Sequence, residues 1–181
     1  MRKVMVCGLL AIWLAIVFSI SAWAGWDPAS EQKEKSAVQE TIAKFKKADA
    51  SMQVFFDKAY GYVVFPSVGK GGFIVGGAHG DGWVYEQARH IGRASIVQVT
   101  VGAQIGGQSF MEIIFFKNKA ALDDFKQGNF ELNAQISAVA VKEGASKDAS
   151  YDNGVAVFTM PRKGLMAEAS VGGQKFEFTP K

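Results

Sequence analysis

The residues best suited to chemistry lie in one glycine-rich stretch, FPSVGKGGFIVGGAHGDGWVYE, which runs from Phe65 to Glu86. This stretch places Lys70 among glycines and large apolar residues. Three kinds of structure use such a sequence: a loop that wraps a phosphate, a tightly turned antiparallel sheet, and a surface on which a lipid approaches the backbone. The spacing of the glycines decides whether the stretch is a phosphate-binding loop or one of the other two structures.

The stretch does not fit a phosphate-binding loop. Such a loop needs a glycine five positions before the Gly-Lys pair and a Ser or Thr after it, but Val64 and Gly71 occupy these positions. The dinucleotide-binding pattern fails as well, because Ile74 stands where its third glycine belongs. A tightly turned sheet and a lipid-facing surface remain.

Metal binding is not expected. His79 and Asp81 are close enough in sequence to share a metal, but two ligands do not make a site. The segment DASYDNG, residues 148–154, resembles a calcium-binding loop. That loop needs Gly at its sixth position and Glu at its twelfth, where Asn153 and Thr159 stand.

The candidate catalytic residues do not form a recognisable set. Ser67 has no histidine that the sequence favours as its base. Glu112 and Glu131 both fall in predicted strands, and the sequence does not pair them. We therefore expect no enzyme, no cofactor and no metal.

The N-terminus has the pattern of a secretory signal. Arg2 and Lys3 precede an uncharged apolar run, and Ala22 and Ala24 provide the small residues of a cleavage site. We expect a signal peptide over 1–24 with cleavage after Ala24, and a single domain over 25–181 that is periplasmic or secreted. A retained membrane anchor is the alternative. Cys7 precedes most of the apolar run, so it does not mark a lipoprotein.

The charge of the remaining chain is close to neutral. Without Arg2 and Lys3, the 20 basic residues become 18, against 17 acidic residues, so the net charge of +3 falls to +1. This balance gives no reason to expect a nucleic-acid partner.

The hydrophobic pattern predicts an α+β fold: a strongly curled, mostly antiparallel sheet with N-terminal helices and one inserted helix. The Asp-Gly pair at 81–82 predicts a hairpin turn at 80–82, and Pro66 is expected to end a strand. The strand at 109–116 is apolar on both faces and should be central. The predicted helices cover 28–48, 52–59 and 118–128; the predicted strands cover 62–65, 72–79, 83–86, 94–101, 109–116, 130–141, 154–160, 165–171 and 175–179.

The helix at 28–48 has a narrow apolar stripe of Val38, Ile42 and Phe45, with Lys44 and Lys47 beside it. It suits either a membrane surface or packing on its own domain.

Three separated blocks resemble the SYLF domain family. The first is AYGYVVFPSVGKGGFIVGGAHGDGWVY, the second is GAQIGGQSFMEIIFFKNKAALDDF, and the third is RKGLMAEASVGG. The matching positions are Ala59, Gly61, Lys70, Gly72, Phe73, Gly76, Gly80, Gly82, Gly102, Gly106, Gln108, Glu112, Phe125, Lys163, Gly164 and Leu165. The resemblance covers roughly residues 36–178.

The resemblance implies a non-enzymatic lipid-binding module. Eukaryotic members bind phosphoinositide membranes, and yeast relatives also bind actin. An exported chain of nearly neutral charge is not expected to meet actin, so the implied partner is an anionic phospholipid or a membrane surface of the cell envelope. A structural or protein-interaction domain that keeps the fold without lipid affinity is the alternative.

The expected lipid site combines glycine backbone, cations and aromatic rings: Lys70, Gly71, Gly72, Phe73, Trp83, Lys44 and Lys47. The glycines and aromatics also suit close strand packing and a core position. Three lysines near an anionic surface contribute about 3 kcal/mol, which is less than the ~4 kcal/mol of a millimolar complex. The lipid site therefore also requires an apolar groove, expected between the N-terminal helix and the sheet.

Overall fold

The computed structural model describes residues 28–72, 75–101, 108–128, 131–132, 138–162 and 173–181. The chain divides into two compact units, residues 1–33 and residues 34–181. The first unit contributes only residues 28–33, the start of helix α1, to the described part. The predicted signal peptide lies outside it. Within the described ranges, no helix is both long and apolar enough to cross a membrane.

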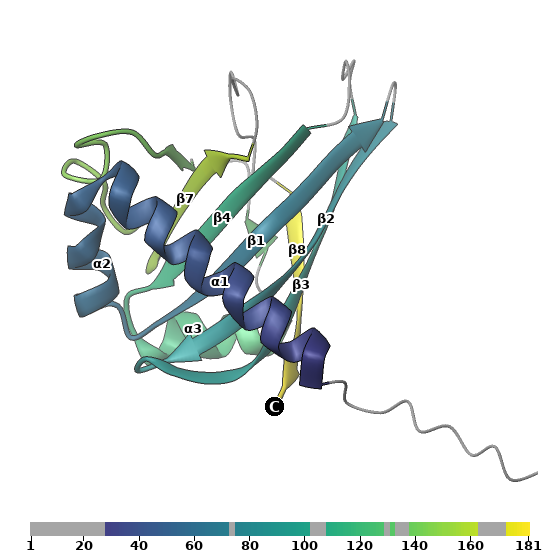
Figure 1. Ribbon diagram of the computed structural model, residues 1–181, viewed down its shortest axis with the longest axis horizontal. Helices are drawn as coiled ribbons and strands as arrows, with labels where there is room; N and C mark the ends of the chain where they lie inside the picture. Colours follow the sequence, from purple (N-terminus) through teal and green to yellow (C-terminus); the bar gives the residue numbers. More distant parts are fainter. Residues whose placement is uncertain (1–27, 73–74, 102–107, 129–130, 133–137, 163–172) are drawn as a thin grey trace, which may run out of the picture. The chain divides into compact units, whose positions relative to one another are not determined.

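The elements follow the expected order of helices, strands, one inserted helix and further strands (Figure 1). The helices are α1 (Pro28–Ala48), the 3-10 turn η1 (Ala50–Met52), α2 (Gln53–Lys58) and α3 (Lys119–Lys126). The strands are β1 (Gly61–Gly72), β2 (Val75–Glu86), β3 (Arg89–Val101), β4 (Gln108–Phe116), β5 (Glu131–Leu132), β6 (Val139–Ala140), β7 (Val155–Pro161) and β8 (Gln174–Pro180).

The strands form one sheet in the order β5-β8-β3-β2-β1-β4-β7-β6. Every pairing is antiparallel except that of β6 with β7. This confirms the α+β class, the mostly antiparallel sheet and the central position of β4. The expected strong curl is not supported, because in the described residues the edge strands β5 and β6 do not pair with each other and the sheet stays open.

Three strand predictions differ from the structure. The predicted hairpin at 80–82 is wrong, because β2 runs without a break to Glu86 and the tight turn falls at Gln87 and Ala88, both with positive φ. Pro66 does not end β1, because a register shift between Val64 and Ser67 accommodates it. The strand predicted over 130–141 is not one strand: β5 pairs with β8, and β6 pairs with β7. The strand predicted over 165–171 lies outside the described residues.

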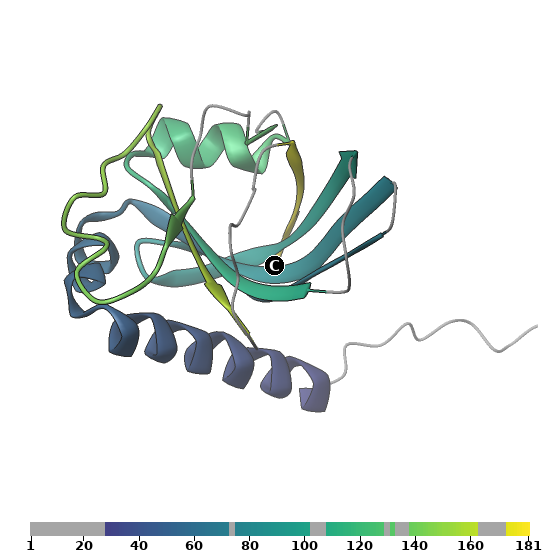
Figure 2. The same ribbon diagram turned by 90° about the horizontal axis from the view of Figure 1, so that it is seen from above.

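Each face of the sheet buries its own core (Figure 2). Val63 and Phe65 point to the face covered by α3, whereas Val64 points to the face covered by residues 34–48 of α1 and by α2. Val38 and Phe45 of α1 are buried against this second face. Of the two expectations for the helix at 28–48, packing on its own domain is therefore the one that the structure shows for residues 34–48.

The glycines of β2 allow β1 and β2 to pack closely. A Cβ atom on Gly82 would lie 2.5 Å from the carbonyl oxygen of Val64 and 2.6 Å from the ring of Phe65. On Gly80 it would lie 2.6 Å from the carbonyl oxygen of Ser67. These glycines therefore have a packing role inside a strand, and not a role in a turn.

We expect Gly82→Ala to lower the free energy of unfolding by about 2–3 kcal/mol, because the strands must move apart to admit the methyl group. Gly69→Ala is the matched control: its nearest neighbour, the carbonyl oxygen of His79, would lie 4.0 Å from the new Cβ. Its effect should stay within about 0.5 kcal/mol. Urea unfolding measures both, and equal losses would contradict the packing argument.

Candidate functional site

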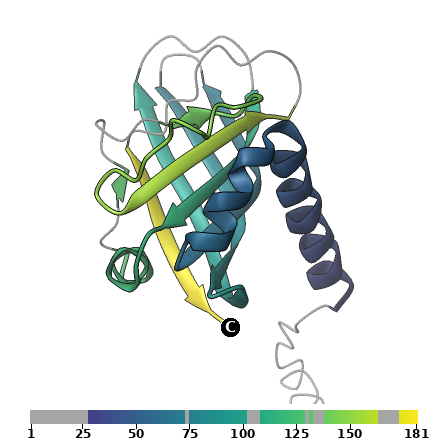
Figure 3. The ribbon, with the colours of Figure 1, turned by 90° about the vertical axis from the view of Figure 1, so that its left-hand side faces the viewer.

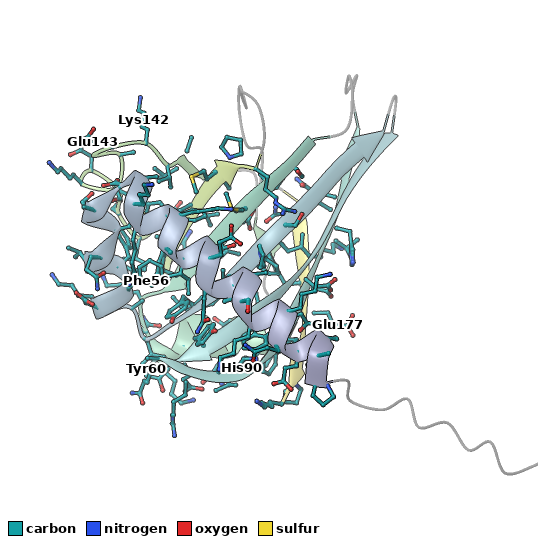
Figure 4. All side chains as sticks on the ribbon, viewed as in Figure 1. Phe56, Tyr60, His90, Lys142, Glu143 and Glu177 are labelled. Atoms are coloured by element: carbon teal, nitrogen blue, oxygen red, sulfur yellow. The ribbon has the colours of Figure 1, made fainter. Side chains whose placement is uncertain are left out.

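A pocket of about 410 Å³ lies between α2 and the segment that precedes β7. We call it the α2 pocket. Figure 3 looks onto α2 with β7 behind it, and Figure 4 labels Lys142 and Glu143 on the adjoining loop. The pocket is lined by Ser51, Val54, Phe55, Lys58, Ser146, Lys147, Ala149 and Tyr151.

The walls of the α2 pocket are mainly apolar. Phe55 is buried and lies against the rings of Phe115, Tyr151 and Phe158, with centroid distances of 5.5, 5.6 and 4.8 Å. Val54 on the same helix is 50% exposed, which is unusual for a large apolar side chain among the described residues. The pocket therefore combines a rigid aromatic floor with an apolar wall that solvent reaches.

Two lysines give the α2 pocket a positive charge. Lys58 ends α2, and Lys147 lies in the facing segment; both are exposed and both line the pocket. The ion pairs of the described part of the chain do not involve either lysine. Both ammonium groups are therefore available to an anion.

Tyr151 adds a neutral hydrogen-bond donor. Its hydroxyl oxygen is buried and has no hydrogen-bond partner among the described residues. Burial raises the pKa of Tyr151 to about 12, so the phenol keeps its proton at neutral pH. A buried donor without a partner is costly in the folded protein.

Asp49 holds the two sides of the α2 pocket together. This buried carboxylate accepts hydrogen bonds from the backbone and hydroxyl of Ser51 in η1 and from the backbone and hydroxyl of Ser146 in the facing segment. Burial alone would raise the pKa of Asp49, but these four hydrogen bonds outweigh it and hold the pKa below its usual range.

A groove of about 670 Å³ lies between residues 34–38 of α1 and the sheet, and the described residues that line it do not include Lys70. Its charged lining consists of Glu34, Asp81, Glu177 and Arg93, so acids outnumber bases (Figure 4 labels Glu177). The one arginine already pairs with Glu34 at 2.8 Å. This groove does not suit an anionic head group.

The residues that the sequence proposed for lipid do not converge in the described structure. Lys70, Gly71 and Gly72 end β1, and Phe73 lies outside the described residues. Trp83 faces Val64, six positions before Lys70 on β1 and therefore about 20 Å from it.

The remaining proposed residues have other surroundings. Trp83 is 5% exposed, stacks on His90 at 3.8 Å and donates its indole N–H to Glu34 at 3.2 Å. On α1, Lys44 pairs with Glu40 at 2.7 Å, and Lys47 is exposed.

Sequence reasoning missed the α2 pocket because its two sides are distant in the chain. Val54 and Lys58 are four residues apart on a short helix, and this spacing was the one available signal. Lys147 and Tyr151 come from an irregular segment that the Asp49 hydrogen bonds and the Phe55–Tyr151 ring contact bring to α2. Periodicity does not reveal such a contact.

Among the described residues, no group of three or more His, Cys, Asp and Glu side chains gathers in one place. His79 and Asp81 lie 3.6 Å apart and are both largely exposed.

The structure defines an α+β domain, and comparison with known proteins gives its family. Residues 97–180 match the family described as "Ysc84: Las17-binding protein actin regulator". The protein named "Beta cell expansion factor A" from Aeromonas veronii is 33% identical over 129 residues, which are 70% of this chain and 48% of that protein. The chain thus spans about half the length of this relative. It carries a domain of the Ysc84 family, which confirms the SYLF resemblance.

We expect Tyr151→Phe to raise the free energy of unfolding by about 1 kcal/mol, because it removes a buried hydroxyl that has no partner. Chemical denaturation at neutral pH measures the change. The control is Tyr60→Phe, which breaks a 2.8 Å hydrogen bond to Glu86 and should not stabilise. A clear loss of stability in Tyr151→Phe would show that the hydroxyl has a partner in the folded protein.

We expect Asp49→Asn to lower the free energy of unfolding at pH 7 by about 2 kcal/mol, because hydrogen bonds to a charged acceptor are lost. The folded pKa lies below the unfolded value of about 3.9, so the carboxylate stabilises fully above that pH and progressively less below it. The difference from wild type should therefore shrink in acid.

Unfolding curves from pH 3 to pH 7 test the Asp49 prediction. Asp124→Asn, at an exposed site of α3, is the control. A difference between wild type and Asp49→Asn that does not change with pH would contradict the role of the charge.

Proposed function

We propose that this domain is a non-enzymatic binding module for an anionic amphiphile, a phospholipid or a membrane surface, and that the α2 pocket is its site. The observation that carries the proposal is the combination in one pocket of apolar walls and two lysines that form no ion pair among the described residues. An acyl chain suits Val54 and Phe55, and an anionic head group suits Lys58 and Lys147.

The expected affinity for one lipid is weak. Two lysines near an anionic surface contribute about 2 kcal/mol. Burial of roughly 100 Å² of apolar ligand surface adds about 2.5 kcal/mol. The sum corresponds to a dissociation constant of about 1 mM or slightly below. A vesicle, which presents many lipids at once, is therefore the appropriate ligand.

The family supports binding as the general activity. The SYLF resemblance implies lipid, and the family description names an actin regulator that binds Las17. A protein-interaction domain without lipid affinity is the second candidate, favoured by that description. We further propose that residues 1–24 direct export, which would place the domain in the periplasm or outside the cell and away from actin.

Co-sedimentation of the purified protein with vesicles tests the proposal. We expect binding to phosphatidylglycerol vesicles that weakens at physiological salt, and little binding to phosphatidylcholine vesicles. Lys58→Glu combined with Lys147→Glu should weaken binding about tenfold or more, because two attractive charges become repulsive.

Three charge-reversed variants serve as controls. Lys44→Glu with Lys47→Glu, and separately Lys70→Glu, test the site that the sequence proposed. Lys35→Glu with Lys175→Glu tests exposed lysines elsewhere on α1 and β8. We expect each to bind within about twofold of wild type. Loss of binding in the Lys44/Lys47 or Lys70 variants alone would move the site away from the α2 pocket. Wild type that binds neither kind of vesicle would favour the protein-interaction domain.

A further inference from the structure

A second group of polar side chains lies inside the core on the α3 face. Glu112 of β4 is directly opposite Thr159 of β7. Gln174 of β8 is directly opposite Gln98 of β3. All four side chains are at most 1% exposed. Strand alternation places them on the same face as Phe110, Ile114 and Phe176.

One hydrogen bond joins the two pairs across the face. The side-chain N–H of Gln174 donates to Glu112 Oε2 at 3.1 Å. In the sheet order, three strands separate β8 from β4. The bond therefore joins two strands that are not neighbours in the sheet. Polar groups from β4, β7 and β8 thus meet at one place in an otherwise apolar core.

Three oxygen atoms at this place have no hydrogen-bond partner among the described residues: Glu112 Oε1, Thr159 Oγ1 and Gln174 Oε1. Native proteins rarely leave buried polar atoms unpaired, and a group of them indicates a bound molecule or ion. Each of these oxygens accepts hydrogen bonds, so the missing group is a donor or a cation.

Neither protonation state of Glu112 satisfies the group. An ionised carboxylate would place a buried negative charge in the core without an ion-pair partner among the described residues. A protonated carboxyl would carry its proton on Oε1, because Oε2 accepts from Gln174, and this single proton satisfies at most one of the other unpartnered oxygens. Burial raises the pKa of Glu112 to about 8 in the absence of any added partner.

We propose that Glu112, Thr159 and Gln174 form a site for a small cation of single charge, either a monovalent metal ion or a primary ammonium group. One carboxylate balances one positive charge, and the carboxamide and hydroxyl oxygens are the hard ligands that such a cation prefers. An ammonium group brings three N–H donors for three acceptors. The surrounding rings of Phe65, Phe110 and Phe176 exclude water and suit a cation.

The site is independent of the α2 pocket. Glu112 projects toward the α3 face, whereas Phe115 and Phe158, which border the floor of the α2 pocket, project toward the opposite face. A ligand at one site need not contact a ligand at the other. Failure of vesicle binding would therefore not contradict the cation site at Glu112. Failure of cation binding would likewise not contradict the lipid site in the α2 pocket.

Thermal unfolding of the purified full chain at fixed ionic strength tests the proposal. The probes are the chlorides of sodium, potassium and methylammonium, with tetramethylammonium chloride as the reference because this cation is bulky and has no N–H donor. We expect at least one probe to raise Tm in proportion to the logarithm of its concentration above its Kd, by about 5 °C at a hundredfold excess over Kd. A response to sodium or potassium identifies a metal-ion site, and a response to methylammonium alone identifies an ammonium site.

Two variants locate the response. Glu112→Gln keeps the shape and supplies its own N–H donors, so it should fold and lose the response. Thr159→Val removes one ligand oxygen and should weaken the apparent affinity about tenfold. The matched control is Glu177→Gln on the exposed side of β8, which should respond as wild type does.

A measurement on the wild-type protein covers the case in which Glu112→Gln does not fold. The carboxyl ¹³C signal of Glu112 should shift to its ionised position when the cation binds at pH 7. The proposal is overturned if no probe raises Tm above the tetramethylammonium reference. It is also overturned if Glu112→Gln responds as wild type does, or if the ¹³C signal stays unchanged while Tm rises.

Discussion

Burial of both faces of β1 and β4 is the constraint on which the rest of the structure depends. Val63, Val64 and Phe65 are fully buried in β1, as are all residues from Ile113 to Phe116 in β4. An antiparallel sheet with apolar residues on both faces needs a cover on each. Residues 34–48 of α1 with α2 cover one face, and α3 covers the other. The α2 pocket exists because this short helix must seat Phe55 against β4 and β7.

Two buried acids illustrate how hydrogen bonding decides the state of a carboxyl group. Asp49 receives four hydrogen bonds from two serines, and its pKa is held below the usual range. Glu112 receives one, and burial raises its pKa. Both oxygens of the Asp49 carboxylate accept hydrogen bonds, and these bonds connect η1 to the segment before β7. Glu112 Oε1 has no hydrogen-bond partner among the described residues, and for this reason Glu112 indicates a ligand.

The groove beside α1 and the α2 pocket differ in the charge of the residues that line them. Among the charged residues that line the larger groove, acids outnumber bases, whereas the smaller α2 pocket has two lysines without ion pairs in the described structure. The net charge does not reveal this difference between the two cavities, since the chain outside the proposed signal is close to neutral. Electrostatic selection of a ligand depends on the few charges near an apolar surface, and these charges sit together only in the folded chain.

The sequence by itself determined the α+β class, the central strand β4, the packing stripe of α1 and the family, because hydrophobic periodicity and ordered motifs are local properties. It did not determine the path of β2 through Gly80 and Gly82, since the same residues suit a turn and a closely packed strand, and only the approach of β1 selects between them. The α2 pocket and the Glu112 group were decided by tertiary structure alone. Each joins residues far apart in sequence, 97 positions for Asp49 and Ser146 and 62 for Glu112 and Gln174, and no local pattern encodes such a contact.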